Sequence, residues 1–283
     1  MSTAFSHLQK LLPQHRLSRL AGKLADSRRD WVRRSLIRSF AAFYDISLAE
    51  ALREDLDDYV SFNDFFTRVL KPDARPMPAD PATIVSPADG TLSQFGEIQH
   101  DMLYQAKGKH YSLDALLGAD PIAGKLDGGW FSTIYLAPSD YHRVHMPLEG
   151  RLLRYHAVPG ELFSVNALTA EGITDLFCRN ERLVCIFDTA LGEVAMVLVG
   201  AMIVASIETV WGEPRSPYRE YCSVDLSNAT DPGSLKFTRG QEMGRFLLGS
   251  TVILCLPRGK FSASESLAEG HSIRLGSPIG RIG

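Results

Sequence analysis

The sequence predicts an α+β protein, with a mainly β body of sandwich or barrel-like architecture and amphipathic helices gathered at the N-terminus. Three observations lead to this prediction. Apolar residues follow helical spacing up to about residue 70, short β-branched runs dominate beyond Ile84, and Asp-Gly or Gly-Gly turn signals separate several of those runs. A chain of 283 residues, 45% hydrophobic and 22% charged, is long enough to bury one large core.

Three helices are predicted in the N-terminal part. Residues 5–24 place leucines on shared faces, with lysine and arginine at the other positions. A second helix is predicted from Ser27, because Asp30 three residues later resembles a capping box. The third, Ser61–Leu70, begins with the same serine-to-aspartate spacing and carries a stripe of phenylalanines that is typical of a core.

The charge of the chain is unevenly distributed. Residues 1–40 hold nine lysines and arginines against Asp26 and Asp30, a formal +7, whereas the whole chain carries -3, which leaves -10 for the remainder. A basic segment on an acidic body indicates an anionic partner. We expect no nucleic acid, because no aromatic-rich basic platform accompanies the charge. From the pattern alone, helices on an anionic membrane surface and helices packed on the body are equally supported.

The predicted strands of the body are, in order, Thr91–Phe95, Trp130–Leu136, Arg151–Ala157, Leu183–Asp188, Val194–Val199, Met202–Thr209 and Thr251–Leu256. A short helix is predicted at Ser112–Leu117. The longest apolar run, Val194–Ile207, has 14 residues and is too short for a membrane-spanning helix, so it is interpreted as two short strands or one long bent strand. We therefore expect a soluble or peripheral protein.

The cysteines argue against a zinc ribbon, because none of them forms a C-x-x-C pair. Cys178, Cys185, Cys222 and Cys255 stand in apolar or mixed runs and are interpreted as small buried hydrophobes in a reducing compartment. The N-terminus also lacks an uninterrupted apolar signal core, so no secretory leader is expected.

Candidate chemistry first appears in Ser139–Pro147, a stretch dense in tyrosine, histidine, arginine and aspartate. His142 and His145 have a spacing that suits a metal on a helix or tight loop, but no H-E-x-x-H and no third ligand stand nearby. This density favours catalysis over a metal site or structural histidines. Asp89, in the Ser86–Gly90 segment, is either an ordinary Asp-Gly turn residue or the acid that orients a histidine.

Gly249, Ser250 and Thr251 interrupt an otherwise apolar strand. The simplest interpretation is a bulge or another strand irregularity. The alternative is reactive, because a serine hydroxyl can attack the carbonyl just before it and convert the peptide into an ester. Glycine removes the Cβ that would hinder a strained backbone there, and a neighbouring base must take the proton. The tripeptide alone does not decide between the two.

Six motifs, taken together, resemble the phosphatidylserine decarboxylase family in its bacterial form. They are "FNDFFTR" at Phe62–Arg68, "KPDARP" at Lys71–Pro76, "SPADG" at Ser86–Gly90, "YHRVHMP" at Tyr141–Pro147, "PGELFSVN" at Pro159–Asn166 and "EMGRFLLGSTVIL" at Glu242–Leu254. They occur in the family's order and span about residues 60–260. The N-terminal 50 residues carry only the general basic-helix character.

The resemblance implies a lyase that is synthesised as a zymogen. Autocatalytic cleavage between Gly249 and Ser250 would give a large chain, residues 1–249, and a small chain, residues 250–283. Ser250 would become a covalent pyruvoyl group, which is the only cofactor implied. The substrate amine would form a Schiff base with that group, whose carbonyl takes up electrons as carbon dioxide leaves.

The resemblance also implies roles for individual side chains. Asp89 and His145 would support Ser250 in self-cleavage, and His142 would act in decarboxylation. Thr251 is our own addition, as a donor to the developing oxyanion, with an ordinary strand residue as the alternative.

Phosphatidylserine would be the substrate and phosphatidylethanolamine the product, which places the chain in phospholipid biosynthesis. We therefore interpret residues 1–50 as a membrane-docking segment and residues 51–283 as the catalytic domain. The expected location is peripheral, on the cytoplasmic face of the inner membrane, and a homodimer is expected from the family.

Three rival functions are kept. One is a pyruvoyl enzyme acting on a free amino acid, against which the basic helices argue. Another is a hydrolase that uses Ser250, His145 and Asp89 without cleavage, although the chain has no G-x-S-x-G elbow. The third is a membrane-binding β protein without activity. The last two predict an intact chain.

Overall fold

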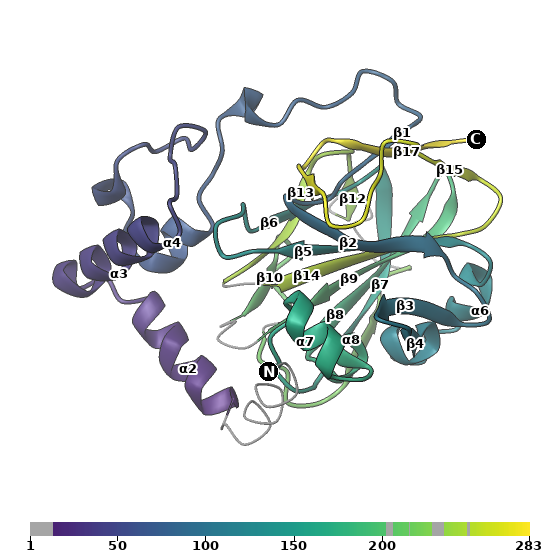
Figure 1. Cartoon of the computed structure of the whole chain (residues 1–283), viewed down its shortest axis with the longest axis horizontal. Coiled ribbons are helices and arrows are strands. Elements are labelled where there is room, and N and C mark those ends of the chain that lie inside the picture. Colours follow the sequence, from purple (N-terminus) through teal and green to yellow (C-terminus); the bar gives the residue numbers. More distant parts are fainter. Residues whose placement is uncertain (1–13, 202–205, 215, 228–234, 248–249) are drawn as a thin grey trace.

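The computed structural model describes residues 14–201, 206–214, 216–227, 235–247 and 250–283. Predictions that fall on residues 1–13, on the start of Met202–Thr209 and on Gly249 lie outside these residues. Figure 1 shows a group of helices formed by the N-terminal part and a larger β body formed by the rest of the chain. The predicted α+β class is therefore confirmed.

An aromatic core holds the helical part together. Its helices are α2 (Gln14–Ala25), α3 (Asp30–Phe43) and α4 (Phe62–Phe66), with the short 3-10 helix η1 (Leu56–Asp58) before α4. The buried residues that they share are Ala25, Ile37, Ala41, Tyr59, Phe62, Phe65 and Phe66. The predicted phenylalanine stripe is thus the surface on which the three helices meet.

Two helix boundaries differ from the sequence prediction. Helix α3 begins at Asp30 rather than Ser27, because the Ser27 hydroxyl accepts from the amide of Arg29 and forms a turn before the helix. The serine cap of α4 is confirmed, since Ser61 Oγ accepts from the amide of Asp64 at 3.2 Å. Helix α4 nevertheless ends at Phe66 instead of Leu70. The residues after it leave the helical conformation, and Val69 and Leu70 pair with residues 51 and 52 through backbone hydrogen bonds.

The body is built on one open antiparallel sheet. Its order is β11 (Cys222–Asp225), β7 (Gly150–Val158), β8 (Arg182–Thr189), β9 (Gly192–Val199), β14 (Ser250–Leu256), β5 (Trp130–Leu136), β2 (Gly90–Glu97) and β16 (Ser272–Ile273), with β12 (Lys236–Phe237) also paired to β7. Six of the predicted strands match members of this sheet, namely β2, β5, β7, β8, β9 and β14.

Strand β14 lies at the centre of the sheet, and all seven of its residues are buried. Its alternate residues face two cores: Val252 and Leu254 point into one, Ile253 and Cys255 into the other. Because both faces are covered, the strand reads as a continuous apolar run rather than as alternating apolar and polar residues.

Smaller elements cover the two faces. One face is covered by two small three-stranded sheets. The first has the order β1 (Thr83–Val85), β17 (Pro278–Ile282) and β15 (Phe261–Ala263). The second has the order β10 (Ile207–Thr209), β13 (Glu242–Phe246) and β6 (Arg143–His145). The other face carries the hairpin β3 (Met102–Ala106), β4 (Lys109–Ser112) and the helices α5 (Leu113–Leu116), α6 (Ala123–Leu126), α7 (Ala167–Gly172) and α8 (Leu176–Arg179). The remaining 3-10 helix, η2 (Pro72–Ala74), lies on the connection into the body.

The long apolar run and the cysteines can now be placed. Strands β9 and β10 belong to different sheets, so the described residues of Val194–Ile207 contribute to two strands rather than one. Cys185 and Cys255 are buried as predicted, whereas Cys222 is exposed on the edge strand β11, where the prediction of burial is wrong. None of the helices in the described ranges is long and apolar enough to cross a bilayer.

Candidate active site

Ser250 is the first residue of β14 and is fully buried. Its hydroxyl has no hydrogen-bond partner among the described residues, and neither has that of Thr251. A buried hydroxyl without a partner is costly, and in native proteins such groups require an explanation. Gly249, whose carbonyl Ser250 would attack, lies outside the described residues.

The sheet register brings the Asp89 turn towards Ser250. Tyr135 on β5 pairs with Thr251 on one side and with Thr91 on the other. Two neighbouring strand spacings therefore separate the start of β14 from the start of β2, which is roughly 10 Å between backbones. Ser250 and Asp89 stand just before these two paired residues, so they lie at the same end of the sheet.

The stretch Ser139–Pro147, here called the histidine segment, reaches this end from a different sheet. Strand β6 pairs with β13, which ends at Phe246, four residues before Ser250. The amide of Phe246, four residues before Ser250, donates to the carbonyl oxygen of His142 at 3.0 Å. This backbone hydrogen bond joins His142 to a residue four positions before Ser250, although His142 and Ser250 stand 108 positions apart in the chain.

His142 is neutral and has an unused lone pair. Its Nδ1 donates to the carbonyl oxygen of Asp140 at 2.9 Å, and since a carbonyl only accepts, Nδ1 carries the proton. Complete burial, together with the nearby charge of Arg68, lowers the pKa of His142 to about 3. Nε2 is buried without a partner among the described residues, and the Phe66 ring contacts the imidazole with centroids 4.0 Å apart. This nitrogen is therefore available to accept a proton.

His145 has the same tautomer but a different neighbour. Its Nδ1 donates to the carbonyl oxygen of Gly240 at 2.8 Å, and Nε2 accepts from the Tyr141 hydroxyl at 3.0 Å. Burial lowers the pKa of His145 below its usual value and raises that of Tyr141, so the ring is neutral and the phenol keeps its proton at neutral pH.

Asp89 is held by an arginine. Its carboxylate accepts from Nε and Nη2 of Arg75 and from the amide of Leu275, and only 9% of each of the two charged side chains is exposed. Arg75 also pairs with Glu50, which pairs in turn with Arg274, so this ion network joins the helical part to the body.

A backbone hydrogen bond brings the segments of Asp89 and His145 together. The amide of His145 donates at 2.8 Å to the carbonyl oxygen of Pro87, two residues before Asp89. Their side chains belong to separate hydrogen-bonding groups in the described structure, although the negative charge of Asp89 is among the contributions that oppose the lowering of the His145 pKa by burial. The segments that carry Asp89, His142 and His145 are thus joined to one another or to β13 by backbone hydrogen bonds.

Replacing Arg75 with glutamine is expected to lower the free energy of unfolding by about 3 kcal/mol, because Asp89 would remain buried without its charged partner. Urea unfolding is measured on a Ser250→Ala background, which lacks the side chain expected to cleave the chain. The matched control is Arg281→Gln, whose arginine is 69% exposed in its pair with Asp80 and should contribute less than about 1 kcal/mol. Equal losses in the two variants would contradict this role of Arg75.

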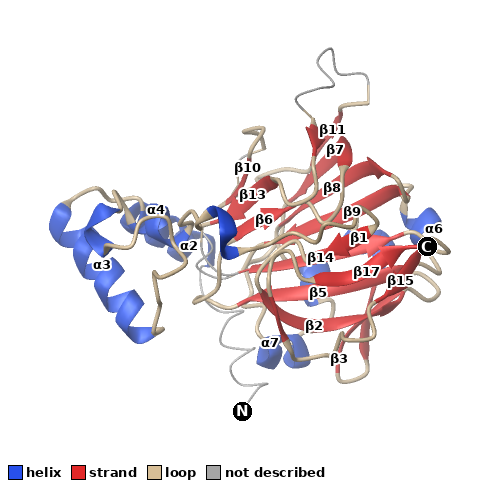
Figure 2. Ribbon diagram, turned by 90° about the horizontal axis from the view of Figure 1, so that it is seen from above, coloured by secondary structure: helices blue, strands red, loops and turns tan. Residues whose placement is uncertain are grey.

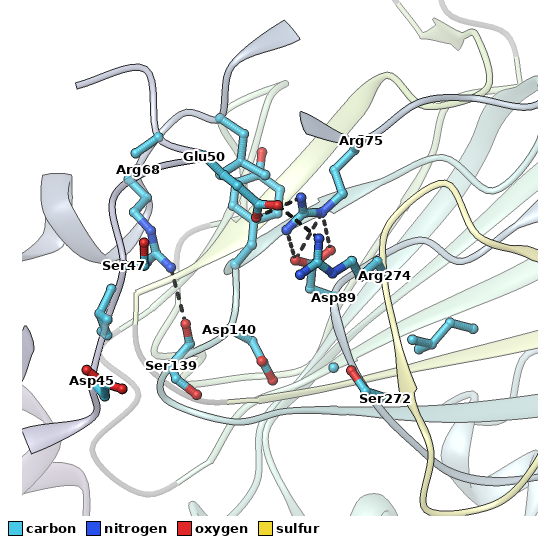
Figure 3. Close-up of a pocket in the computed structure, with 16 residues that line it drawn as sticks. Asp45, Ser47, Glu50, Arg68, Arg75, Asp89, Ser139, Asp140, Ser272 and Arg274 are labelled. Atoms are coloured by element: carbon cyan, nitrogen blue, oxygen red, sulfur yellow. Dashed lines mark hydrogen bonds and ion pairs between the residues drawn. The ribbon is translucent and has the colours of Figure 1, made fainter. Parts of the chain in front are cut away.

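A polar pocket of about 210 Å³ lies beside the histidine segment, between the helical part and the body (Figure 3). Its walls include Arg68, Arg75, Asp89, Ser139, Asp140, Tyr141 and Arg274. Sequence analysis assigned no role to Arg68, Arg75 or Tyr141. The sequence offers one signal for Arg68, which is a charged residue two positions after the last phenylalanine of an apolar stripe. Among the described residues, no group of three or more metal-ligating side chains is present.

Relatives of the chain identify its class. It is 49% identical to a phosphatidylserine decarboxylase proenzyme from a Polaromonas species over 99% of both chains. It is 50% identical to one from Azotobacter vinelandii over 96% of both, and 49% identical to one from Hahella chejuensis over 97% of this chain and 92% of that protein. These relatives are decarboxylases made as proenzymes.

The family models agree with this class along the chain. The phosphatidylserine decarboxylase model matches residues 62–281, and a second model, described as PSD, matches residues 4–45. The chain belongs to the phosphatidylserine decarboxylase family. The resemblance carried by the six sequence motifs is confirmed.

Proposed function

We propose that this chain decarboxylates phosphatidylserine to phosphatidylethanolamine, using a pyruvoyl group made from its own Ser250. The observation that carries the proposal is the buried, unbonded Ser250 hydroxyl at the start of the central strand. This position suits a serine that is converted into a pyruvoyl group, because the conversion breaks no hydrogen bond between the Ser250 hydroxyl and another described residue. The proenzyme names of the relatives support the same conclusion.

Self-cleavage would begin when Ser250 Oγ attacks the Gly249 carbonyl, so that a carbon–oxygen bond forms and the peptide carbon–nitrogen bond breaks. His145 Nε2 would take the hydroxyl proton after releasing the Tyr141 hydroxyl. Loss of the Ser250 α-proton would then break the Cβ–oxygen bond and leave a Gly249 carboxylate on the large chain. Water replaces the nitrogen of the dehydrated residue, ammonia leaves, and the pyruvoyl group remains.

The role of Asp89 in this step would be electrostatic. Its carboxylate is bound to Arg75 and to the Leu275 amide, so it does not orient the histidine ring directly. Its charge favours the protonated form of His145, which is the form produced when the serine loses its proton. This arrangement gives less support to the rival hydrolase, which needs an aspartate hydrogen-bonded to the histidine.

The pyruvoyl group supplies the carbonyl that takes up the electron pair left by carbon dioxide. The chain's own contribution is proton transfer and charge stabilisation. His142 Nε2 has a free lone pair in the described structure, so it would take the proton that the substrate ammonium releases as its amine reacts, and return that proton to the α-carbon after carbon dioxide leaves. The unpaired hydroxyl of Thr251 would donate to the oxyanion that forms next to Ser250.

Substrate choice tests the proposed activity against its nearest rival. Purified protein is expected to release labelled carbon dioxide from phosphatidylserine that carries the label in its serine carboxyl group. Free serine labelled at the same carbon should give release at the level of a protein-free blank. Comparable turnover of free serine would support the rival pyruvoyl enzyme and contradict a lipid substrate.

We also propose that the helical part docks on an anionic membrane. Figure 2 shows α2 and α3 extending to one side of the body. Leu20, Trp31 and Phe43 are 59%, 73% and 80% exposed there, and the surrounding surface carries exposed arginines. An apolar hollow of about 500 Å³ lies between these helices. Exposed apolar groups beside basic residues are typical of helices that lie in a headgroup region.

Replacing Leu20, Trp31 and Phe43 together with aspartate is expected to weaken binding to anionic vesicles at least about tenfold, because apolar contacts are lost and repulsion is added. Vesicle co-sedimentation measures the change. These substitutions are cleaner than deletion of residues 1–40, which would also remove Ile37 from the helical core. Leu168→Asp is the control, since Leu168 is 58% exposed but lies on the body. Equal binding of both variants would exclude docking through the helices.

A further inference from the structure

Arg68 occupies an unusual position at the end of the buried stripe. Only 6% of the residue is exposed, and its side chain lines the polar pocket (Figure 3). Nη2 donates to the carbonyl oxygen of Ser139 at 3.2 Å. Nη1 is buried and has no partner among the described residues. One half of the planar guanidinium is therefore fixed by the protein, and the other half is free to bind.

The other arginines of the pocket already have their carboxylates. Arg75 pairs with Asp89, and Arg274 pairs with Glu50 (Figure 3). Of the other two carboxyls that line the pocket, Asp45 is exposed and Asp140 is half-buried. Asp140 accepts from the amide of Ala137, and burial raises its pKa. Arg68 forms no ion pair with any described residue. Its guanidinium lies 5.9 Å from the centroid of the Phe65 ring, but a buried charge without a counter-ion is costly, and binding of an anion would offset part of that cost.

The pocket adjoins the reacting groups. Phe66, two residues before Arg68, contacts the His142 ring, and Tyr141 both lines the pocket and donates to His145. The volume of about 210 Å³ is below the roughly 300–1,000 Å³ of pockets that enclose a drug-sized ligand. It suits a lipid headgroup rather than acyl chains. In phosphatidylserine, only a few bonds separate the reacting amine from the phosphate.

We propose that Arg68 binds the phosphodiester group of the lipid headgroup, with Nη1 as the donor. This inference rests on the proposed function. The geometry of a guanidinium suits phosphate and carboxylate oxygens equally well, so geometry does not tell which of the two groups Arg68 binds. The chemistry of the reaction distinguishes them. The substrate carboxylate loses its charge as carbon dioxide leaves, and an arginine bound to it would stabilise the substrate more than the transition state. The phosphodiester keeps its charge throughout, and both substrate and product carry it.

The expected signature is a change in KM with little change in kcat. With a soluble short-chain phosphatidylserine, Arg68→Gln should raise KM at least about tenfold and leave kcat within about threefold. Arg68→Lys keeps the charge but loses the planar fork, so it should fall between wild type and the glutamine variant. Arg281→Gln, at an exposed ion pair remote from the pocket, is the control and should match wild type.

Inhibition by glycerophosphoethanolamine separates the two anionic groups, because this compound has the phosphodiester and the amine but no carboxylate. Its inhibition constant should rise in Arg68→Gln by the same factor as KM. An unchanged inhibition constant with a raised KM would assign Arg68 to the carboxylate and overturn the proposal. An unchanged KM with normal processing would overturn it as well.

A direct binding measurement keeps this proposal separable from the proposed function. Calorimetry can measure the binding of glycerophosphoethanolamine to the uncleaved Ser250→Ala protein. This measurement requires neither processing nor turnover. It should weaken at least about tenfold when Arg68→Gln is added, and equal binding would overturn the proposal. If the glutamine variant does not fold, Arg68→Lys is measured instead, with a smaller loss expected and no loss contradicting it. Failure of the wild type to decarboxylate would refute only the proposed function.

Discussion

Replacement of Ser250 with alanine is expected to give a single uncleaved chain with no decarboxylase activity. Alanine has no hydroxyl to attack the preceding carbonyl, and without cleavage no pyruvoyl group forms. The protein should still fold, because the Ser250 hydroxyl has no hydrogen-bond partner among the described residues whose loss would leave another group unpaired. Denaturing electrophoresis reports the processing, and release of labelled carbon dioxide reports the activity.

Ser132→Ala is a closely matched control. Ser132 is fully buried, its hydroxyl also lacks a partner in the described structure, and it lies on β5 opposite Leu254 of the same central strand. This variant should be cleaved and active like wild type. Cleavage of the Ser250 variant, or equal failure of both variants, would contradict a specific role for Ser250.

His145→Ala is expected to block processing, whereas His142→Ala should be cleaved but decarboxylate at least about a hundredfold more slowly. The reason lies in the proposed proton transfers: His145 would take the proton of Ser250, and the free Nε2 of His142 would return one to the substrate. Mass spectrometry of freshly folded protein measures cleavage, and a single-turnover assay measures decarboxylation.

His110→Ala controls for loss of an imidazole, because His110 is exposed on the outer hairpin. It should be processed and active. The reverse outcome, with the His142 variant uncleaved and the His145 variant cleaved but inactive, would show that the two histidines exchange roles. Normal processing and activity in both variants would exclude the histidine segment from the chemistry.

The long strands could be predicted because their apolar runs record burial within a central sheet. Strand β5 has the predicted bounds, and β14 begins one residue before its predicted start. The short strand β6 carries Arg-Val-His, with no apolar run of its own, and exists because β13, about 100 residues later, pairs with it. Local patterns contain no information about such a partner.

The contrast between local patterns and distant partners also explains which site residues could be predicted. Asp89, His142 and His145 stand in compact motifs, so the sequence alone predicts them as candidate catalytic residues. The arginine that holds Asp89 comes from a separate segment, and the helical part contributes Glu50 to the same network. The free charge of Arg68 could not be predicted, since its pairing depends on where every other carboxylate of the pocket lies.

The helical part and the histidine segment are directly connected. Phe66 contacts the His142 ring, and the carbonyl oxygen of Thr67 accepts from Nε of Arg143 at 2.8 Å. Arg68 donates to Ser139 just before the histidines. The end of α4 therefore positions the segment that carries the proposed catalytic groups, and docking and chemistry would take place on neighbouring surfaces of one structure.

The intact mass of the purified wild-type protein, measured under denaturing conditions, tests the central claim most directly. Two chains are predicted, residues 1–249 and residues 250–283, and the small chain should begin with a blocked, ketone-bearing group that reacts with hydroxylamine. A single unmodified chain that still contains Ser250, in freshly folded wild-type protein, would contradict self-cleavage and the pyruvoyl group that depends on it.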